Sequence, residues 1–535
     1  MSSFVDARHA GLLVPLFSMP STSSWGVGEI ADIPVMAAWL RECGLDMLQL
    51  LPLNEMAAGQ NSPYFALSAL ALDPIYISVE RIPEFRALGG VEHRSPGTRD
   101  RLRQVQAARM VQYPEVRRIK AEALVAAYRQ FVAAEWRRDT PRARQFETFR
   151  RNQAWWLRDY ALFRALHERF RARAWTEWPG PLRHRESAVL QRAGVELQDE
   201  MLLLEYLQWI ASEQWQRARR DLAGVALFGD LPFMVSLDSA DVWARQAQFD
   251  LEAQVGVPPD AFSATGQAWG LPAYRWDAHE RDDYRWLRDR ARRSAELYDG
   301  CRIDHLVGFY RTYVIPRVGT PFFVPAEREA QIAQAERVMN IFRSPGCRVI
   351  AEDLGTVPDY VRQSLARLGV PGFKVLRWER DWNVPGQPFR DPACYPAASV
   401  AMTGTHDTEP MRAWWERAPA EERAAALQIP GLEAAGASLD SPFSAALRDE
   451  FLRVLFHAGS DLLTLPIQDV FGWSDRINVP ATQDAANWSY RLPWPVDRLS
   501  ANPEAREAAA RLRRWAEESG RSRTGRPPAS RERTG

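Results

Sequence analysis

The stretch GCRIDHLVGFYRTY, residues 300–313, places charged side chains where a short apolar strand ends. Arg302 and Asp304 alternate with Ile303, so in an extended chain the two charged residues share one face of the strand. A guanidinium beside a carboxylate on that face is either a buried structural ion pair or part of a functional site. The rest of the sequence helps to decide between a structural ion pair and a functional site.

Eight short apolar runs of this kind recur along the chain, bounded by turn-forming residues. Helical patterns separate most of them, such as VPDYVRQSLARLG before the sixth run and ALRDEFLRVLFHAG before the eighth. Alternating helices and eight strands predict an α/β fold, the (β/α)8 TIM barrel. The runs are AGLLVPL (10–16), DMLQLLPL (46–53), VALFGDLPF (225–233), CRIDH (301–305), RVIAEDLG (348–355), GFKVLRW (372–378), SVAMTGTHD (399–407) and DLLTLPIQD (461–469).

Two intervals are too long for simple connections and predict insertions into one catalytic barrel, residues 1–516. Residues from about 80 to 222 predict a mainly helical subdomain, in which the aromatic stripe of WWLRDYALFRALHERF lies in the core. Residues from about 234 to 295 are dense in Gly, Pro, Trp and Tyr with little periodicity, and predict a long structured loop near the substrate. Residues 517–535 lack apolar anchors and predict a disordered tail.

Composition argues against several functional classes. The 68 basic residues balance the 68 acidic ones, so no net charge favours nucleic acid or an anionic membrane as a partner. The N-terminus shows no signal-peptide pattern, and no run of about 18 apolar residues occurs, which predicts a cytoplasmic protein. The four cysteines are far apart, so we expect core packing for them and neither a disulfide framework nor a zinc site.

Carboxylates dominate the residues that end the predicted strands, where a barrel of this type carries its chemistry. A single strand-end aspartate is more often a helix cap or a turn residue, and we expect this of Asp353 and Asp469. Several converging carboxylates serve either a metal or acid–base work on a sugar, and no Asp-rich loop suited to a hard cation is evident. The residues collected in this way are Asp230, Arg302, Asp304, Glu352, Asp353, His406, Asp407 and Asp469.

Chemistry on a glycosidic bond needs a nucleophile and a general acid/base, about 5 to 5.5 Å apart in a retaining enzyme. Arg302 favours the charged form of Asp304, as a nucleophile requires. Glu352 follows the apolar VIA, and partial burial would raise its pKa and keep the proton that a leaving group needs. His406 and Asp407 are candidates for hydrogen bonds to sugar hydroxyls.

The motifs resemble those of the 4-α-glucanotransferases called amylomaltases or disproportionating enzymes, glycoside hydrolase family 77 of the α-amylase clan. The resemblance covers residues 9 to about 500. The PPD…SATGQAWG loop is specific to this family, whereas RIDH and THD alone fit the wider clan. The motifs are NSPYFALSALALDP, WLRDYALF, GDLPFMVSLDSADVWA, GVPPDAFSATGQAWG, RIDH, AEDLG, TGTHD and RINVPATQDAANW.

This resemblance implies roles for individual residues. The family's nucleophile falls on Asp304, its acid/base on Glu352 and its transition-state-stabilising aspartate on Asp407. The implied reaction transfers α-1,4-glucan segments between maltooligosaccharides by a retaining double displacement, without a metal or an organic cofactor. The implied fold is the barrel without a separate C-terminal β-domain. Sugar-binding roles are implied for Tyr64, Asp260, Trp269, Arg302, His305, His406 and Asn478, and the flat rings of Tyr64 and Trp269 suit an apolar pyranose face.

Some positions depart from the usual family pattern. Leu271 follows WG where Asn is usual, Thr408 and Glu409 stand in place of the common HDNDT, and Ala481 replaces Gly. The run KVLRWERDW also replaces the typical KVLQF. These rim positions bear on chain-length preference and acceptor choice, and the catalytic trio is complete.

Two other functions stay open at this point. A hydrolase would use the same residues with water in place of the sugar acceptor, and water exclusion is not readable from a sequence. A non-catalytic glucan-binding protein would be signalled by loss of a catalytic carboxylate, and all three are present.

Overall fold

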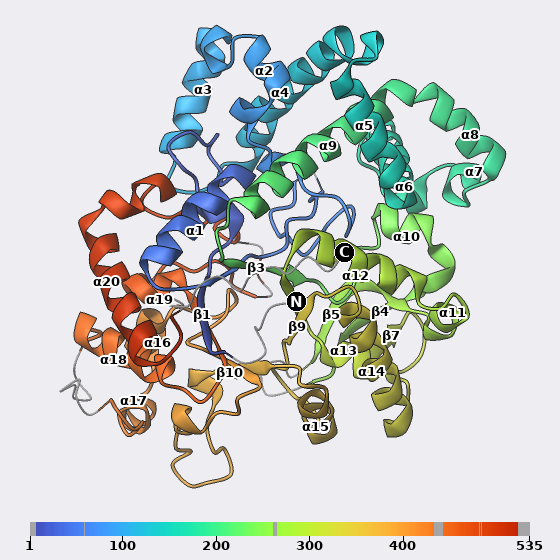
Figure 1. Cartoon of the computed structure of the whole chain (residues 1–535). Helices are drawn as coiled ribbons and strands as arrows, with labels where there is room; N and C mark the ends of the chain where they lie inside the picture. The colour runs from blue at the N-terminus through green and yellow to red at the C-terminus, as the bar shows by residue number, and fades with distance from the viewer. Residues whose placement is uncertain are drawn as a thin grey trace, which may run out of the picture.

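The computed structural model describes residues 7–57, 59–259, 265–432, 442–480, 482 and 484–522. Eight strands in this part of the chain close into a parallel barrel whose order around the ring follows the chain (Figure 1). The predicted α/β barrel is therefore confirmed: six strands lie inside their predicted runs, and β1 and β6 each begin one residue before theirs. The strands are β1 (His9–Leu13), β2 (Met47–Gln49), β3 (Ala226–Leu231), β6 (Gly300–Ile303), β9 (Arg348–Ala351), β10 (Gly372–Val375), β11 (Ser399–Met402) and β12 (Leu462–Pro466).

Apolar residues from the barrel strands form a buried cluster of their own, as expected where both faces of parallel strands are covered. On β6, Gly300 makes room for this cluster, because a Cβ there would lie 2.3 Å from the Phe228 ring. The glycine at the start of the opening motif thus lets the strand approach the core. The cluster consists of Met47, Ala226, Phe228, Ile350, Phe373, Val375, Val400, Met402 and Leu462.

Helices between and after the strands cover the barrel. No helix in the described ranges combines the length and the apolar character needed to cross a membrane. These helices are α1 (Ile33–Glu42), α13 (Val307–Tyr310), α14 (Arg328–Arg343), α15 (Asp359–Leu368), α16 (Met411–Arg417), α17 (Ala420–Ala426), α18 (Ala445–Phe456), α19 (Ile467–Phe471) and α20 (Pro503–Glu518).

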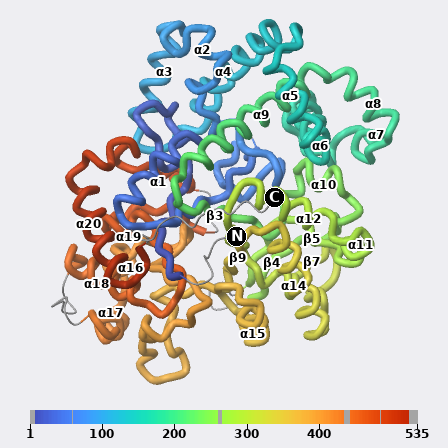
Figure 2. The backbone as a smooth tube through the Cα atoms, in the orientation of Figure 1, coloured from blue at the N-terminus to red at the C-terminus, as the bar shows by residue number. Residues whose placement is uncertain are grey.

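The interval from about 80 to 222 is helical, as its periodicity predicts. Figure 2 shows these helices gathered on one side of the barrel, with α6 packed against α9. The aromatic stripe of α6 lies in the core except for Trp155, which is only partly buried and carries the Arg292 guanidinium 4.6 Å from its ring centre. The helices are α2 (Pro83–Ala87), α3 (Pro96–Ala107), α4 (Tyr113–Ala134), α5 (Pro141–Asn152), α6 (Ala154–Arg169), α7 (Gly180–Arg183), α8 (Ser187–Glu196) and α9 (Gln198–Arg220).

The interval from about 234 to 295 contains more regular structure than the predicted long structured loop. It contains two antiparallel strands that join two later ones in a second sheet, in the order β5-β4-β7-β8. Neither inserted strand alternates buried and exposed residues regularly, and β4 also pairs with β7, which lies beyond β6, so a local pattern could not reveal the sheet. The elements are α10 (Ala240–Ala244), β4 (Phe249–Val257), β5 (Gln267–Tyr274), α11 (Trp276–Arg281), α12 (Arg285–Leu297), β7 (Thr312–Pro316) and β8 (Phe322–Val324).

The predicted disordered tail begins too early. Helix α20 continues to Glu518, and the Arg521 side chain is fully buried. Its guanidinium donates hydrogen bonds to main-chain carbonyls of Phe456 and Ser460 at the base of the barrel. A charged residue therefore anchors residues 517–522, and residues 523–535 lie outside the described ranges.

The cysteines are mostly in the core, as expected. Cys43, Cys301 and Cys347 are buried, with the last two sulfurs 3.8 Å apart. Cys394 is exposed, and the expectation is wrong there because it ends a surface turn between β10 and β11.

Candidate active site

Three adjacent barrel strands bring the charged residues of the opening motif to one place. In the register of β3, β6 and β9, Asp230 lies beside Arg302, and Arg302 beside Ile350. Because the strands are parallel, Asp304 and Glu352, which follow β6 and β9, emerge together at their C-terminal ends. The sheet register therefore builds the cluster from residues far apart in sequence.

Arg302 is the centre of this cluster. Its side chain is 5% exposed, and Nη2 lies 2.8 Å from Asp304 Oδ1 and 4.0 Å from Glu352 Oε2. Nη1 donates hydrogen bonds to both carboxyl oxygens of Asp230, at 2.9 and 2.7 Å. One guanidinium thus faces three carboxyl groups, and the predicted pairing of Arg302 with Asp304 is confirmed.

The two carboxyl groups are close enough for joint chemistry. Asp304 Oδ1 and Glu352 Oε2 lie within 2.8 and 4.0 Å of the same nitrogen. They are therefore no more than about 7 Å apart, which accommodates the roughly 5 to 5.5 Å of a retaining pair. The Asp304 side chain is 30% exposed, so a ligand can reach it.

Glu352 is suited to hold a proton. Its carboxylate accepts hydrogen bonds from the backbone N–H groups of His305 (2.7 Å) and Leu354 (3.0 Å). Burial and the nearby Asp304 charge raise its pKa to about 7, against the opposing effect of Arg302. The predicted direction of this pKa shift is confirmed, and the group holds or releases a proton near neutral pH.

Asp407, which follows β11, is held in the ionised form. Asn478 Nδ2 donates a 2.6 Å hydrogen bond to Oδ1, and His406 Nε2 lies 3.3 Å from Oδ2. Burial would raise the pKa of Asp407, but the charge of His406 and these hydrogen bonds lower it well below its usual value. In turn Asp407 raises the pKa of His406, against the burial that lowers it. The Asp407 carboxylate is therefore a fixed negative charge.

Tyr64 lies at the same mouth, on the loop after β2. Its hydroxyl donates to Asp230 Oδ2 at 2.9 Å and lies 3.1 Å from His406 Nε2. Its ring is stacked on His406 at 5.4 Å with an interplanar angle of 16°. Trp488 packs at a tilt against both rings. One face of the Tyr64 ring is therefore occupied by His406.

Trp269 and His305 meet beside Asp304. Trp269 lies on β5 and is partly buried, and its ring contacts His305 edge-on at 4.8 Å. His305 has a positive φ of 44°, a strained conformation for a residue with a Cβ. Burial lowers its pKa to about 4, although Asp304 opposes this, so the imidazole is neutral near pH 7. The second sheet thus contributes directly to the site.

Two strand-end carboxylates that were expected to be helix caps or turn residues instead bind backbone groups of other segments. Asp353 accepts a hydrogen bond from the N–H of Phe373, and Asp469 accepts one from Met411. Asp260, a candidate sugar ligand, lies outside the described residues. Asp230 and Trp488 belong to the cluster without a predicted role: Asp230 is signalled only by its strand-end position, and Trp488 is one of 21 tryptophans.

Two departures from the family pattern have structural explanations. The Thr408 hydroxyl donates to the carbonyl of Thr405 at 3.0 Å and stabilises the turn after β11. Glu409 forms an ion pair with Arg417 at 2.9 Å. Leu271 packs against the core cluster around the second sheet, and Ala481 lies outside the described residues.

Within the part of the chain that the structure describes, no group of three or more His, Cys, Asp or Glu side chains could hold a metal ion. The absence of a cofactor stays a prediction from the resemblance.

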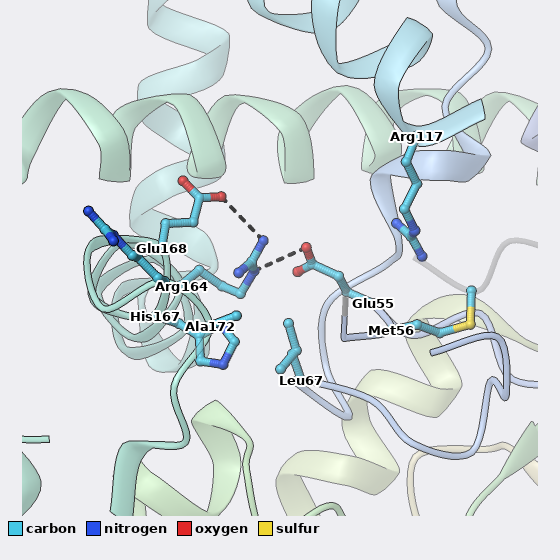
Figure 3. A pocket seen from close by; sticks show the side chains of 9 residues that line it. Glu55, Met56, Leu67, Arg117, Arg164, His167, Glu168 and Ala172 are labelled. Carbon is cyan, nitrogen blue, oxygen red and sulfur yellow. Dashed lines mark hydrogen bonds and ion pairs between the residues drawn. The ribbon is translucent and has the colours of Figure 1, made fainter. Parts of the chain in front are cut away.

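A separate cavity of about 340 Å³ lies behind the loop that carries Tyr64. Figure 3 shows Arg164 of α6 reaching toward Glu55 of this loop, with Arg117 on the other side. Arg164 Nε donates to Glu55 Oε1 at 3.1 Å, and the Glu55 carbonyl accepts from Leu67 at 2.7 Å. The buried ion pair therefore anchors the base of the Tyr64 loop to the helical insertion.

Arg164→Leu is expected to lower the free energy of unfolding by about 3–5 kcal/mol at pH 8, because it leaves a buried carboxylate without its cation. Burial already raises the pKa of Glu55, and Arg164 opposes this rise. In the variant the folded-state pKa rises further, so the missing stability is regained as the pH falls and Glu55 takes up a proton. Chemical denaturation at pH 5 and pH 8 measures both effects.

Arg171→Leu is the matched control, because Arg171 lines the same cavity but is exposed. The Arg171→Leu substitution should change the free energy of unfolding by no more than about 0.5 kcal/mol. Equal costs for the two variants, or a loss for Arg164→Leu that is independent of pH, would contradict the anchoring role.

Comparisons with known proteins identify relatives of the whole chain. The chain matches the family model described as 4-alpha-glucanotransferase over residues 14–497. The 4-alpha-glucanotransferase of Thermus thermophilus is 33% identical to it, over 94% of this chain and 99% of the relative. The chloroplastic/amyloplastic 4-alpha-glucanotransferase of Solanum tuberosum is 30% identical, over 94% and 85%. A solved structure, amylomaltase from Streptococcus agalactiae in complex with acarbose, is similar with a TM-score of 0.80 and 26% identity, over 96% and 100% of the two chains.

Proposed function

The chain belongs to the 4-alpha-glucanotransferase family, and from that membership we propose how three carboxyl groups at the mouth of its barrel carry out the reaction. It is an enzyme that transfers α-1,4-glucan segments from one chain to another. The roles of single residues are the proposal. One observation supports these roles: Arg302 Nη2 lies within 4.0 Å of both the Asp304 and the Glu352 carboxyl groups.

In the first step Asp304 attacks the anomeric carbon of the donor glucan. Glu352 gives its proton to the glycosidic oxygen, and the bond to the leaving chain breaks. The product is a glycosyl ester of Asp304. The pKa of about 7 for Glu352, set by burial and the Asp304 charge, supports its role as the acid. The fixed charge of Asp407 stabilises the positive charge that develops on the sugar ring.

In the second step an acceptor sugar takes the place of the leaving chain. Glu352, now ionised, removes the proton from the acceptor 4-hydroxyl, which attacks the anomeric carbon and releases Asp304. Two inversions at the same carbon restore the α configuration. Tyr64, Trp269, Arg302, His305, His406 and Asn478 are proposed to contact the sugars, and Asp260 is proposed by resemblance alone.

The proposed donors and acceptors are maltooligosaccharides. With maltotriose alone the enzyme should produce glucose together with chains longer than maltotriose, because a bound maltosyl group passes to another sugar. Glucose and maltose alone would mean that water is the acceptor, and the family makes this hydrolase alternative the less favoured one. The cytoplasmic location stays a prediction, and the name of the potato relative places that protein in plastids.

Trapping the covalent intermediate tests the assignment of Asp304. Glu352→Gln enzyme is mixed with an α-maltosyl fluoride, whose fluoride leaves without a proton, so the first step proceeds while the second lacks its base. The ester should accumulate, and mass spectrometry of a proteolytic digest should find the sugar mass on the peptide that contains Asp304. A sugar on any other residue would overturn the assignment.

A further inference from the structure

Trp382 is the only exposed residue among the 21 tryptophans of the chain, all of which lie in the described ranges. It is 53% exposed, and Val384, two residues further on, is 47% exposed. A ring of this size stabilises a fold when it is buried, and the position of Trp382 forgoes much of that gain. Stability of the core therefore does not explain why the ring lies in solvent.

The ring stands on an ordered hairpin, residues 379–390, that follows β10. Main-chain hydrogen bonds close this hairpin, from the N–H of Arg390 to the carbonyl of Glu379 at 2.9 Å and from Asp381 to Pro388 at 2.9 Å. Figure 1 shows the chain after β10 projecting from the barrel near α17. The hairpin is therefore a braced projection that presents its apolar side chains to solvent.

Arg380 fixes the ring from one side. Its guanidinium lies over the rings of Trp382 and Phe389, at 5.1 and 4.8 Å from their centres. Nε donates to the carbonyl of Gln387 at 2.8 Å, and Nη1 lies 3.8 Å from Glu422 Oε1 in α17. One face of the indole is thus covered by a cation that is itself held in place. The exposed part of the ring is pre-organised for a ligand.

The hairpin begins at the mouth of the barrel. Strand β10 lies between β9 and β11 in the ring, and the segments that follow those two strands carry Glu352 and Asp407. Trp378, just before the hairpin, packs against the buried cluster of the barrel, as does Leu354, two residues after Glu352. A glucan that extends beyond the catalytic carboxyl groups therefore has this part of the rim as a path.

The chemistry of the hairpin fits a neutral sugar chain. A pyranose ring has an apolar face, for which a flat aromatic ring is a rigid partner. Asn383 and Gln387 are exposed on the same hairpin, and their amide groups both donate and accept hydrogen bonds, as sugar hydroxyls require. The two basic residues of the hairpin are balanced by two acidic ones, with Arg390 Nε 2.8 Å from Asp381 Oδ1. No net charge favours an anionic partner.

We propose that Trp382 is a platform on which a sugar ring of a long α-1,4-glucan stacks, outside the site that carries out the reaction. This inference goes beyond the proposed function, because it needs the transfer activity of the family and none of the roles proposed for single residues. A short substrate is bound by the active site alone, whereas a long glucan also gains the contact with Trp382. The platform therefore raises the affinity for long glucans and leaves kcat unchanged.

Kinetics of Trp382→Ala with two substrates of different length, amylose and maltotriose, test the platform. The KM for amylose should rise about 5- to 10-fold, the loss expected when an aromatic ring no longer shields a sugar face from water. The kcat for amylose should stay the same, and the KM for maltotriose should change by less than about 2-fold, because the lost contact serves binding of long chains only. Trp382→Phe, which keeps a flat ring, should retain most of the affinity for amylose, and Trp382→Leu should not.

Electrophoresis in native gels that contain soluble amylose measures binding without turnover. In the Asp304→Asn enzyme, adding Trp382→Ala should reduce the retardation by amylose. Phe322→Ala is the matched control, because Phe322 on β8 is another exposed aromatic residue, at 49%. It should leave the KM for amylose and the retardation unchanged.

Three kinetic results would overturn the proposal: an unchanged KM for amylose in Trp382→Ala, an equal rise of KM for amylose and maltotriose, or equal losses in Trp382→Ala and Phe322→Ala. A change of oligomeric state on gel filtration without a change in retardation would also overturn it, since the hairpin would then join two copies of the chain. Failure of the reaction scheme would appear separately, as activity in Asp304→Asn enzyme whose Trp382 is intact.

Discussion

Asp304→Asn is expected to lower turnover of maltotriose by about 10⁴- to 10⁶-fold, the scale on which hydrolases lose activity when a group of their catalytic triad is replaced. An amide does not form the glycosyl ester, so the double displacement cannot begin. The fold should survive, because Arg302 keeps Asp230 as its partner at 2.7 Å and the Asp304 side chain is 30% exposed. Initial rates of glucose release, with circular dichroism of the purified variant, measure both expectations.

Glucan binding separates a chemical defect from a misfolded site. The Asp304→Asn enzyme should still bind maltoheptaose in a calorimeter, since the sugar-contacting groups are untouched. Asp469→Asn, changed in helix α19 after the last barrel strand, should keep most of the turnover. Turnover of the Asp304→Asn enzyme close to that of the wild type would refute the nucleophile assignment.

The barrel is predictable because its strands are continuous apolar runs that end in polar residues. Such runs arise where both faces of a parallel sheet are buried, here the inner face in the core of the barrel and the outer face under helices. Asp304 and Glu352 follow two of these runs, and their meeting in space follows once the strands are placed in chain order around a ring. The proximity of Asp304 and Glu352 can therefore be predicted from the order of the motifs along the chain.

The second sheet could not be predicted from the sequence, because its strands lack a regular pattern of apolar residues. Strand β4 pairs with β7, which lies on the other side of barrel strand β6 in the sequence. Its residues are mixed in burial without a regular alternation. Its pairing with β5 and with the distant β7 stabilises this segment as a strand, although its sequence carries no local strand pattern.

The motifs do not predict which groups the polar side chains of the site contact. Tyr64 appears in the sequence as a flat surface for sugar, whereas the structure uses its hydroxyl to join Asp230 to His406. Arg521 likewise reads as part of a polar tail, yet it is buried against carbonyl groups that only the fold assembles. A polar residue reveals its role only when its hydrogen-bonding partner is placed, and that partner is usually distant in sequence.

Glu352→Gln is expected to slow transfer from maltotriose by about 10²- to 10⁴-fold, the usual contribution of a general acid or base. An α-maltosyl fluoride donor should recover the first step, and added azide should recover the second, because neither needs a proton from Glu352. The rescued product should be the maltosyl azide with the α configuration retained. Glu379→Gln is the matched control, since Glu379 lies on the same rim and pairs with Lys374 at 3.2 Å.

The pH profile makes this prediction specific to Glu352. Burial and the Asp304 charge raise its pKa to about 7, so kcat/KM of the wild type for maltotriose should fall above that pH as the acid loses its proton. With the fluoride donor and azide, the Glu352→Gln enzyme has no such group and should show no basic limb. A rescued variant that keeps the limb near pH 7 would assign the titration, and with it the acid role, to another residue of the site. Loss of the limb together with rescue would tie the proton of the leaving group to the carboxyl held by the backbone N–H groups of His305 and Leu354.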